Sequence, residues 1–315
     1  MQEEVFINNN KSLFTKKDFR FTTLLSLSYL LASGLLIGFK TDQIVLVLIC
    51  TILYYLSLHT RKFITGFSIF IVFWILFDYL KAFPNYNYNA VHILDLYEWE
   101  KSWFGLVADG MLLTPNEYWL KNNNIFLDII CGLFYLMWVP VPIAFSIFLF
   151  LKGKRKQFIS FLLTFLLVNV LGFIVYYLYP AAPPWYIQQY GTEFIKDTPS
   201  NAAQLVKFDQ FFNVPVFQTL YSKGSNVFAA MPSLHSAYPL IVMYYGLKNR
   251  LGKINIFFAV VVVGIWFAAV YTSHHYVLDV LAGVLTAAFG IVLFNGLKKT
   301  RIVKSFIKTM VRAIT

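Results

Sequence analysis

Apolar runs long enough to cross a bilayer recur along this chain, and they constrain its fold more than any other feature. A transmembrane helix needs about 20 apolar residues. Only 13% of the 315 residues are charged and 58% are hydrophobic, whereas a soluble domain carries about a quarter charged residues. The sequence therefore predicts an all-α, polytopic membrane protein. Eight spans are expected, at 21–39, 43–58, 63–80, 125–151, 157–179, 227–247, 255–272 and 275–297.

Two long loops rich in polar and aromatic residues, 81–124 and 181–226, interrupt these spans. We expect residues 1–62 to form a polar tail with two extra helices. Residues 63–297 would form a six-helix core that carries both loops, and residues 298–315 a basic tail. The first twenty residues lack the apolar core of a cleavable signal peptide.

The cationic residues orient the spans. With the N-terminus inside, most of the 26 Lys and Arg residues fall on inner segments, as the positive-inside rule requires. The net charge of +11 is therefore interpreted as a topology signal, with the bilayer as partner and no nucleic acid. The tail after Lys298 is either a helix lying on an anionic inner leaflet or a solvated segment.

Asp279 is the first residue that points to chemistry, because an acid in a membrane helix is costly and needs a partner. His275 precedes it by four residues, a spacing that places both side chains on one helical face. Asp279 would then fix the imidazole tautomer and leave the other nitrogen free as a nucleophile. The alternative is a buried polar pair that only ties helices together.

The stretch "MPSLHSAYP" adds a second histidine on the same outer face. Pro232 suits the first position of a helix. The free N–H groups of that first turn, with the Ser233 hydroxyl, would then bind an anion. His235 would serve as a separate acid and base. Together these residues predict phosphoryl transfer.

A zinc site is the competing interpretation, with His235, His275, Asp279 and the nearby His274 as ligands. We favour the oriented His–Asp pair, and expect no metal and no cofactor. Cys50 and Cys131 lie in apolar runs and are interpreted as small core side chains, not as a disulfide or metal ligands.

Aromatic residues mark both outer loops. In "YPAAPPWY", Trp185 and Tyr186 are interpreted as aromatic-belt anchors, with a loop across the mouth of the site as the alternative. In the loop 81–124, Trp99 and Trp103 favour an interfacial helix. A lid whose acids bind a headgroup is the other possibility, and the acids concerned are Asp95, Glu98 and Glu100.

Read together, these segments resemble the type 2 phosphatidic acid phosphatase superfamily. Its PSxH motif is matched by Pro232, Ser233 and His235, and its HxxxD motif by His275 and Asp279. The resemblance implies a core of six helices and metal-independent chemistry. It also implies that His275 forms a phosphohistidine, that Asp279 orients it, and that His235 protonates the leaving alkoxide.

Over roughly 175–290 the chain is similar to the fungal inositol phosphorylceramide synthase branch of that superfamily, through "PPWY", "PSLHS" and "SHHYVLD". The candidate substrate-binding residues are Ser233, Pro184, Trp185, Tyr186, His274 and Tyr276. The superfamily's arginine six residues before the nucleophile is Ala269 here. Another cation must then balance the phosphate, and four lysines of the outer loops remain open for that role: Lys81, Lys101, Lys207 and Lys223.

The resulting hypothesis is a transferase that moves a phospho-headgroup, phosphoinositol from phosphatidylinositol, to a ceramide-like hydroxyl. The alternative within the same chemistry is a lipid phosphate phosphatase of the phosphatidic acid or polyprenyl phosphate type, with water as acceptor. A proton-relaying transporter or flippase is the alternative of another class. The active site is expected on the non-cytoplasmic face, and a bacterial inner membrane is favoured over a Golgi-type lumen.

Overall fold

The computed structural model describes residues 15–224 and 226–315, and the chain divides into two compact units. One comprises the described part of Met1–Ser68 with Arg312–Thr315, and the other is Ile69–Val311. The prediction of an all-α membrane protein is confirmed. Much of the predicted polar tail falls on residues 1–14, outside the described residues. The predicted limits 1–62, 63–297 and 298–315 remain predictions.

The first unit contains α1 (Lys16–Ile37), α2 (Thr41–Leu56) and the start of α3 (Leu58–Tyr79). Thr15 caps α1, because its hydroxyl oxygen accepts from the Asp18 amide. The Asp18 carboxylate accepts from Tyr54 Oη at 3.2 Å and from Arg61 at 3.4 Å. These bonds tie the first turn of α1 to the end of α2 and the beginning of α3.

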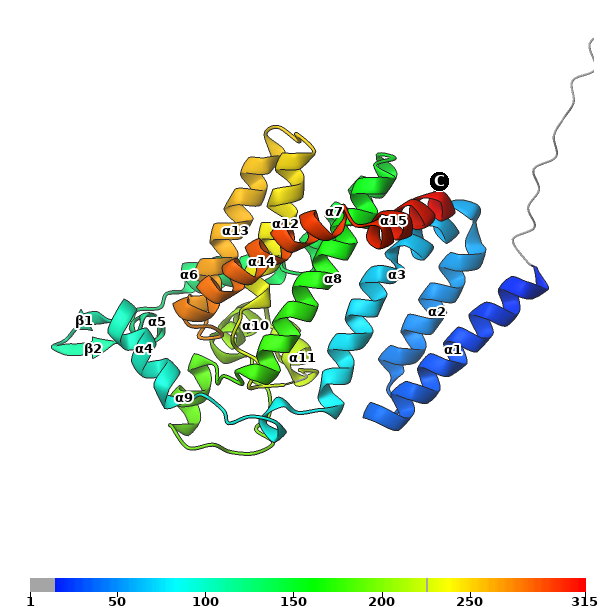
Figure 1. Cartoon of the computed structure of the whole chain (residues 1–315). Coiled ribbons are helices and arrows are strands. Elements are labelled where there is room, and N and C mark those ends of the chain that lie inside the picture. The colour runs from blue at the N-terminus through cyan, green and yellow to red at the C-terminus, as the bar shows by residue number, and fades with distance from the viewer. Residues whose placement is uncertain (1–14, 225) are drawn as a thin grey trace, which may run out of the picture. The chain divides into compact units, whose positions relative to one another are not determined.

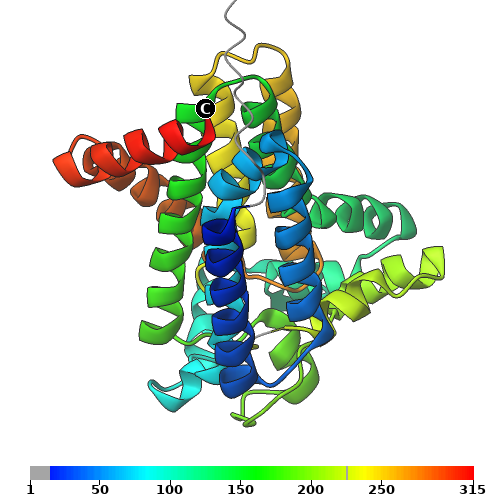
Figure 2. The ribbon, with the colours of Figure 1, turned by 90° about the vertical axis from the view of Figure 1, so that its right-hand side faces the viewer.

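The second unit is a bundle built on α6 (Ile125–Leu136), α7 (Pro140–Leu151), α8 (Arg155–Leu178), α12 (Leu234–Lys248), α13 (Ile254–Tyr271) and α14 (Val277–Leu297). The helix α12 is central and packs on α7, α8, α13 and α14. Figures 1 and 2 show α8, α12 and α13 side by side. Aromatic side chains fill the interior, as where Phe165 meets Phe73 at 5.1 Å and Tyr238 at 4.5 Å between ring centroids.

The spans differ from the prediction in two places. Among the described residues, five helices are long and apolar enough to cross a membrane, and α2 is a shorter apolar helix. The predicted span 125–151 is instead two helices, α6 and α7, bent by 42° at a break before Pro140, which opens α7. If that pair is one span, the number of candidate spans is six.

The predicted span 227–247 begins later, because α12 starts only at Leu234. The preceding residues bond to the outer loop instead of forming helix. Ala181 donates to the Phe228 carbonyl at 2.9 Å and accepts from the Ala230 amide at 3.2 Å. His235 is therefore in the first turn of its helix.

The two long loops, predicted to be outer, are folded, and they lie at the end of the bundle where α12 and α14 begin (Figure 1). The loop 81–124 contains short 3₁₀ turns at Leu80–Ala82 and Asn85–Asn87, then α4 (Leu94–Phe104), the hairpin β1 (Leu106–Ala108) and β2 (Met111–Leu113), and α5 (Pro115–Lys121). The loop 181–226 contains α9 (Pro184–Tyr190), a 3₁₀ turn (Ala203–Leu205), α10 (Val206–Phe212) and α11 (Val216–Ser222). Bridges from His92 to Ala181 and from Ala181 to Ala229 join the two loops to the approach to α12.

The basic tail forms α15 (Arg301–Ile314). Ile302 and Phe306 on it are exposed, whereas Ile307 is buried. The tail is thus helical, and whether it lies on a leaflet or is solvated remains a prediction.

Candidate active site

His235 and His275 face each other at the end of the bundle where α12 and α14 begin. His235 Nδ1 lies 3.0 Å from His275 Nε2, although the two residues are 40 positions apart in the chain. The first turn of α12 carries His235, and the turn between α13 and α14 carries His275. Because α12 and α14 begin at the same end of the bundle, the imidazoles of His235 and His275 meet.

Asp279 lies on the other side of His275. Its Oδ2 atom is 3.6 Å from His275 Nδ1 and accepts from the Tyr276 amide at 2.8 Å. The carboxylate is fully buried, and neither Asp279 Oδ1 nor His275 Nδ1 has a hydrogen-bond partner among the described residues. A small rotation of either side chain would close the His–Asp hydrogen bond. The expectation that both residues share a helical face is wrong, because His275 precedes α14 by two residues.

Backbone contacts fix the turn 272–276. The Ala269 carbonyl accepts from the amides of both His274 (3.2 Å) and His275 (3.0 Å). The Asn116 side chain, on α5, donates to the carbonyls of Val270 (2.8 Å) and His275 (2.9 Å). Ala269 is fully buried, so the superfamily's arginine position is occupied here by a residue that supports the turn.

Ser233 caps α12, and this corrects the expectation for Pro232, which precedes the cap and is not the first helical residue. The Ser233 hydroxyl oxygen accepts from the Ser236 amide at 3.3 Å and from the Ser236 hydroxyl at 3.0 Å. The Ser233 amide donates to the Asp279 carbonyl at 2.9 Å. The first turns of α12 and α14 are thus joined directly, which sets the separation of the two histidines. A contact between Ser233 and substrate remains a prediction.

Tyr135 and Trp138 complete the surroundings of His235, and no local pattern in the sequence predicted either of them. Tyr135 Oη is 3.3 Å from His235 Nδ1, and the Trp138 ring meets the His235 ring edge-on at 4.6 Å. Tyr135 lies in the last turn of α6 and Trp138 in the break before α7. The interruption of the predicted span 125–151 therefore brings these two side chains to the site.

Glu100 reaches the site from α4 and is also fully buried. Its carboxylate accepts from the amides of Val277 (2.9 Å) and Leu278 (3.0 Å), at the start of α14. Burial raises the pKa of Glu100 to about 7, and the two backbone hydrogen bonds partly oppose that shift. Its role is therefore to cap the helix that carries Asp279.

The structure also places the other acids of the proposed lid, and the two tryptophans of the same helix. Asp95 bonds to His92 Nδ1 at 2.5 Å, and Glu98 is exposed on α4. Trp99 is 53% exposed and Trp103 71%, as an interfacial helix requires. Among these acids, Glu100 is thus directed to α14 and not to a headgroup.

The belt interpretation of "PPWY" is wrong, because Pro184, Trp185 and Tyr186 are buried. The Trp185 amide donates to the Ser273 carbonyl at 3.0 Å, and Tyr186 Oη donates to the Glu193 carbonyl at 2.7 Å. The segment therefore braces the histidine turn. Direct substrate contacts by these three residues remain a prediction.

His274 and Tyr276 flank His275 in sequence and point elsewhere. His274 Nε2 lies 3.1 Å from the Ala202 carbonyl, and its ring stacks on Tyr221 at 4.4 Å between centroids. Tyr276 packs among Leu96, Ala181 and Ala230. Their predicted contacts with substrate remain predictions.

Burial controls the charge of the turn's two histidines. It lowers the pKa of His275 to about 4, an effect that the nearby Ala230 carbonyl opposes. It also lowers the pKa of His274 well below its usual range, and the neighbouring His275 and His235 act in the same direction. Near neutral pH the His275 imidazole is therefore neutral, the form that a nitrogen nucleophile needs.

Within the described residues, none of the four lysines left open for balancing the phosphate hydrogen-bonds to His235 or His275. Lys81 pairs with Asp78 at 2.5 Å, and Lys101 donates to Tyr97 Oη at 3.0 Å. Lys207 and Lys223 lie on α10 and at the end of α11. Within residues 15–224 and 226–315, no Lys or Arg hydrogen-bonds to His235 or His275, and no group of three His, Cys, Asp or Glu side chains is arranged to hold a metal ion.

Residues 94–293, which span α4 to α14 and every residue of the site, match the family model described as the PAP2 superfamily. The chain belongs to that superfamily, as its PSxH and HxxxD motifs predicted.

Two relatives place the chain more narrowly within that superfamily. The chain is 39% identical over 294 residues to the phosphoinositol dihydroceramide synthase of Bacteroides thetaiotaomicron, an alignment that covers 93% of this chain and 96% of that protein. It is 28% identical over 183 residues to the inositol phosphorylceramide synthase catalytic subunit of Saccharomyces cerevisiae, covering 58% of this chain and 45% of that protein. The prediction of an enzyme like inositol phosphorylceramide synthase is confirmed by these matches. No solved structure matches the chain.

Proposed function

We propose that this enzyme transfers phosphoinositol from phosphatidylinositol to the hydroxyl of a dihydroceramide-like lipid, through a phosphohistidine at His275. The observation that carries the proposal is the arrangement His235–His275–Asp279, in which His275 Nε2 is 3.0 Å from a second imidazole and Nδ1 is 3.6 Å from a buried carboxylate. The identity of 39% to a phosphoinositol dihydroceramide synthase over nearly the whole chain supports the choice of substrates.

In the first half-reaction, the lone pair of His275 Nε2 attacks phosphorus, and the bond from phosphorus to the diacylglycerol oxygen breaks. His235, which must carry a second proton when the donor lipid is bound, donates that proton to the departing oxygen. Asp279 holds the Nδ1 proton of His275 and stabilises the positive charge that develops on its ring. Since the two imidazoles are in contact in the structure, they must separate to admit the phosphate.

In the second half-reaction, the acceptor lipid's hydroxyl oxygen attacks the phosphohistidine. The acceptor's proton passes to His235, the P–N bond breaks, and both histidines return to their starting forms. No proton is gained or lost over the cycle, so no external acid, base or metal is needed. A histidine at the mouth of the bundle can meet two lipids in turn, which explains a site at the membrane interface.

The site is proposed to face the non-cytoplasmic side of a bacterial inner membrane. Support comes from the placement of charge within the second unit. The turn between α7 and α8, the turn between α12 and α13, and the segment after α14 all lie at the end opposite the histidines (Figure 1). These segments carry Lys152, Lys154, Arg250, Lys253, Lys298 and Lys299, and the positive-inside rule assigns them to the cytoplasm.

The test is a transfer assay with purified protein in detergent, containing EDTA and phosphatidylinositol labelled in its headgroup. The proposal predicts a labelled inositol-phosphate sphingolipid only when dihydroceramide is added, and none with His275→Ala. Release of labelled inositol phosphate, unaffected by dihydroceramide, would replace the transferase with a phosphatase-type hydrolase. Loss of activity with EDTA would contradict the metal-free mechanism.

A further inference from the structure

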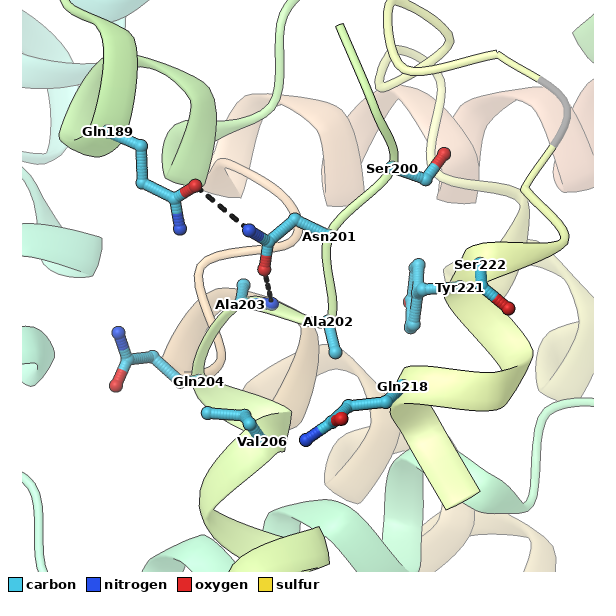
Figure 3. Close-up of a pocket in the computed structure, with 10 residues that line it drawn as sticks. All are labelled: Gln189, Ser200, Asn201, Ala202, Ala203, Gln204, Val206, Gln218, Tyr221 and Ser222. Carbon is cyan, nitrogen blue, oxygen red and sulfur yellow. Dashed lines mark hydrogen bonds between the residues drawn. The ribbon is translucent and has the colours of Figure 1, made fainter. Parts of the chain in front are cut away.

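Two features of the structure lie outside the proposed reaction. One is a cavity of about 550 Å³ formed by the end of α9, residues 200–206 and α11 (Figure 3). Tyr221, His274 and Tyr135 stack one on the next between this cavity and His235, so the cavity is not part of the histidine site. The other feature is the exposed surface of α15.

The sequence of α15 divides into an apolar side and a cationic side. Residues three or four positions apart lie on one face of a helix. These spacings connect the large apolar residues of α15, which are Ile302, Val303, Phe306, Ile307, Met310 and Ile314. They also connect its cations, which are Arg301, Lys304, Lys308 and Arg312. Because the helix contains no acid, its polar side is purely cationic.

The apolar side of α15 is covered along one edge only. Ile307 is buried, with 6% of its surface exposed. Ile302 is 83% exposed and Phe306 46% exposed. Since these two residues are four positions apart, they form one continuous apolar edge. An exposed apolar edge beside a row of cations is typical of a helix that lies in a membrane interface.

The four cations of α15 are exposed, and none of them forms an ion pair with an acid of residues 15–224 or 226–315. Lys298 and Lys299, just before the helix, add to the positive charge. A surface that combines free cations with an apolar edge fits a partner that is anionic and apolar at once. Anionic phospholipids have this combination, since their headgroups are charged and their acyl chains are apolar.

The position of α15 brings such lipids within reach. The preceding helix α14 has 21 residues and is about 30 Å long, enough to cross the hydrocarbon core. Only residues 298–300 separate its end from α15, and three residues span about 10 Å at most. Figures 1 and 2 show α15 running crosswise to α8, which is also long and apolar enough to cross a membrane. The helix α15 is therefore oriented along the membrane surface, close to the headgroups of one leaflet.

We infer that α15 is an interfacial anchor that binds anionic phospholipids of the leaflet at the end opposite the histidines. Ile302 and Phe306 insert below the headgroups, while Lys304 and Lys308 contact the lipid phosphates. Each such cation strengthens association with an anionic surface by about fivefold. The interaction is independent of the transfer reaction, because none of these residues belongs to the histidine site.

The test uses nitroxide spin labels on single cysteines of the full chain, in a background with Cys50→Ala and Cys131→Ala. Phe306→Cys reports on the exposed apolar edge, and Ser305→Cys, exposed on the cationic side, is the matched control. The protein is reconstituted in nanodiscs of phosphatidylcholine, with phosphatidylglycerol added or omitted. In discs with phosphatidylglycerol, the label at 306 should be accessible to oxygen, which concentrates in lipid, and shielded from a neutral nickel chelate, which remains in water. The label at 305 should show the reverse.

Neutralising the cations tests the part of the inference that concerns charge. Lys304→Gln/Lys308→Gln should lower the ratio of docked to undocked helix, followed through the label at 306, by about tenfold or more. Omitting phosphatidylglycerol should act in the same direction. Lys121→Gln/Lys196→Gln removes two exposed lysines of the long loops and should leave the ratio unchanged.

Three results would overturn the inference. Equal nickel accessibility at 305 and 306 would show a solvated tail. Shielding of 306 from both oxygen and nickel would show that protein, such as a second copy of the chain, covers the apolar edge. Docking that ignores both phosphatidylglycerol and the loss of Lys304 and Lys308 would rule out recognition of anionic headgroups. If the label at 306 prevents folding, Ile302→Cys gives the same comparison on the same edge.

Discussion

His275 is held by contacts that leave one of its two nitrogens available for chemistry. The Ala269 carbonyl accepts from its amide and Asn116 donates to its carbonyl, so the backbone is fixed. Asp279 lies beside Nδ1, and His235 faces Nε2. Because the acid is fully buried, its charge acts on the imidazole with little screening by solvent.

At the residue scale, Asp279→Asn should reduce kcat for transfer by about 10²- to 10⁴-fold. The amide can still accept from the Tyr276 amide but cannot stabilise the positive charge that develops on His275. Steady-state kinetics with both lipid substrates would measure the loss. Asp95→Asn is the matched control, because Asp95 bonds to His92 and not to the histidine pair. An Asp279→Asn enzyme with wild-type kcat would show that the acid has no part in the chemistry.

At the scale of the helices, the beginnings of α12 and α14 are in direct contact, and a glycine permits this. A Cβ atom at Gly283 would lie 2.1 Å from the Ser233 carbonyl oxygen. The same helix carries Gly296, where a Cβ atom would have no neighbour within 4 Å. The separation of His235 and His275 therefore depends on a glycine one turn below Asp279.

Gly283→Ala should lower both stability and activity, whereas Gly296→Ala should be neutral or slightly stabilising. The added methyl group at 283 forces α12 and α14 apart, at a cost of about 1–3 kcal/mol. At 296 it only improves helix propensity, by about 0.5–1 kcal/mol. Melting temperatures in detergent and the transfer assay measure the two effects. Equal behaviour of the two variants would contradict the close approach at Ser233.

Glu100 links α4 to α14, and because it is buried, the stability of the protein should depend on pH. Its ordinary pKa of 4.5 is raised to about 7 in the folded protein. Between these values the folded state keeps a proton that the unfolded state has lost, so stability falls as pH rises through this window. Glu100→Gln does not titrate, and the melting temperature of wild type relative to this variant should therefore fall between about pH 4.5 and 7. The exposed Glu98→Gln should follow wild type, and parallel curves for wild type and Glu100→Gln would contradict the assignment.

At the scale of the whole molecule, the orientation in the membrane decides which lipids the site meets. In a background with Cys50→Ala and Cys131→Ala, Thr192→Cys lies in the outer loop and Lys253→Cys at the opposite end of the second unit. In intact bacterial cells a membrane-impermeant maleimide should label position 192 and not position 253. The reverse pattern would place the active site in the cytoplasm.

The sequence predicted the helical class, most of the spans and the meeting of His235, His275 and Asp279. It could do so because apolar runs and charged turns are local features. Together they determine which helix ends lie at the same side of the membrane. It missed the break before α7 and the side chains that it brings to the site, Tyr135 and Trp138. It also gave no sign that Asn116 bonds to the histidine turn and Glu100 to the start of α14, each more than 150 residues away. Such contacts depend on how the loops fold over the bundle, and no spacing in the sequence encodes them.

The most direct test of the account is to trap the enzyme's intermediate. Wild type would be mixed with phosphatidylinositol carrying a radioactive phosphate, without acceptor, and denatured in base, which preserves phosphohistidine. The account predicts label on the peptide that contains His275, its disappearance into sphingolipid when dihydroceramide is added before denaturation, and no label on His275→Ala. Label on another residue, or product formed by His275→Ala, would contradict it.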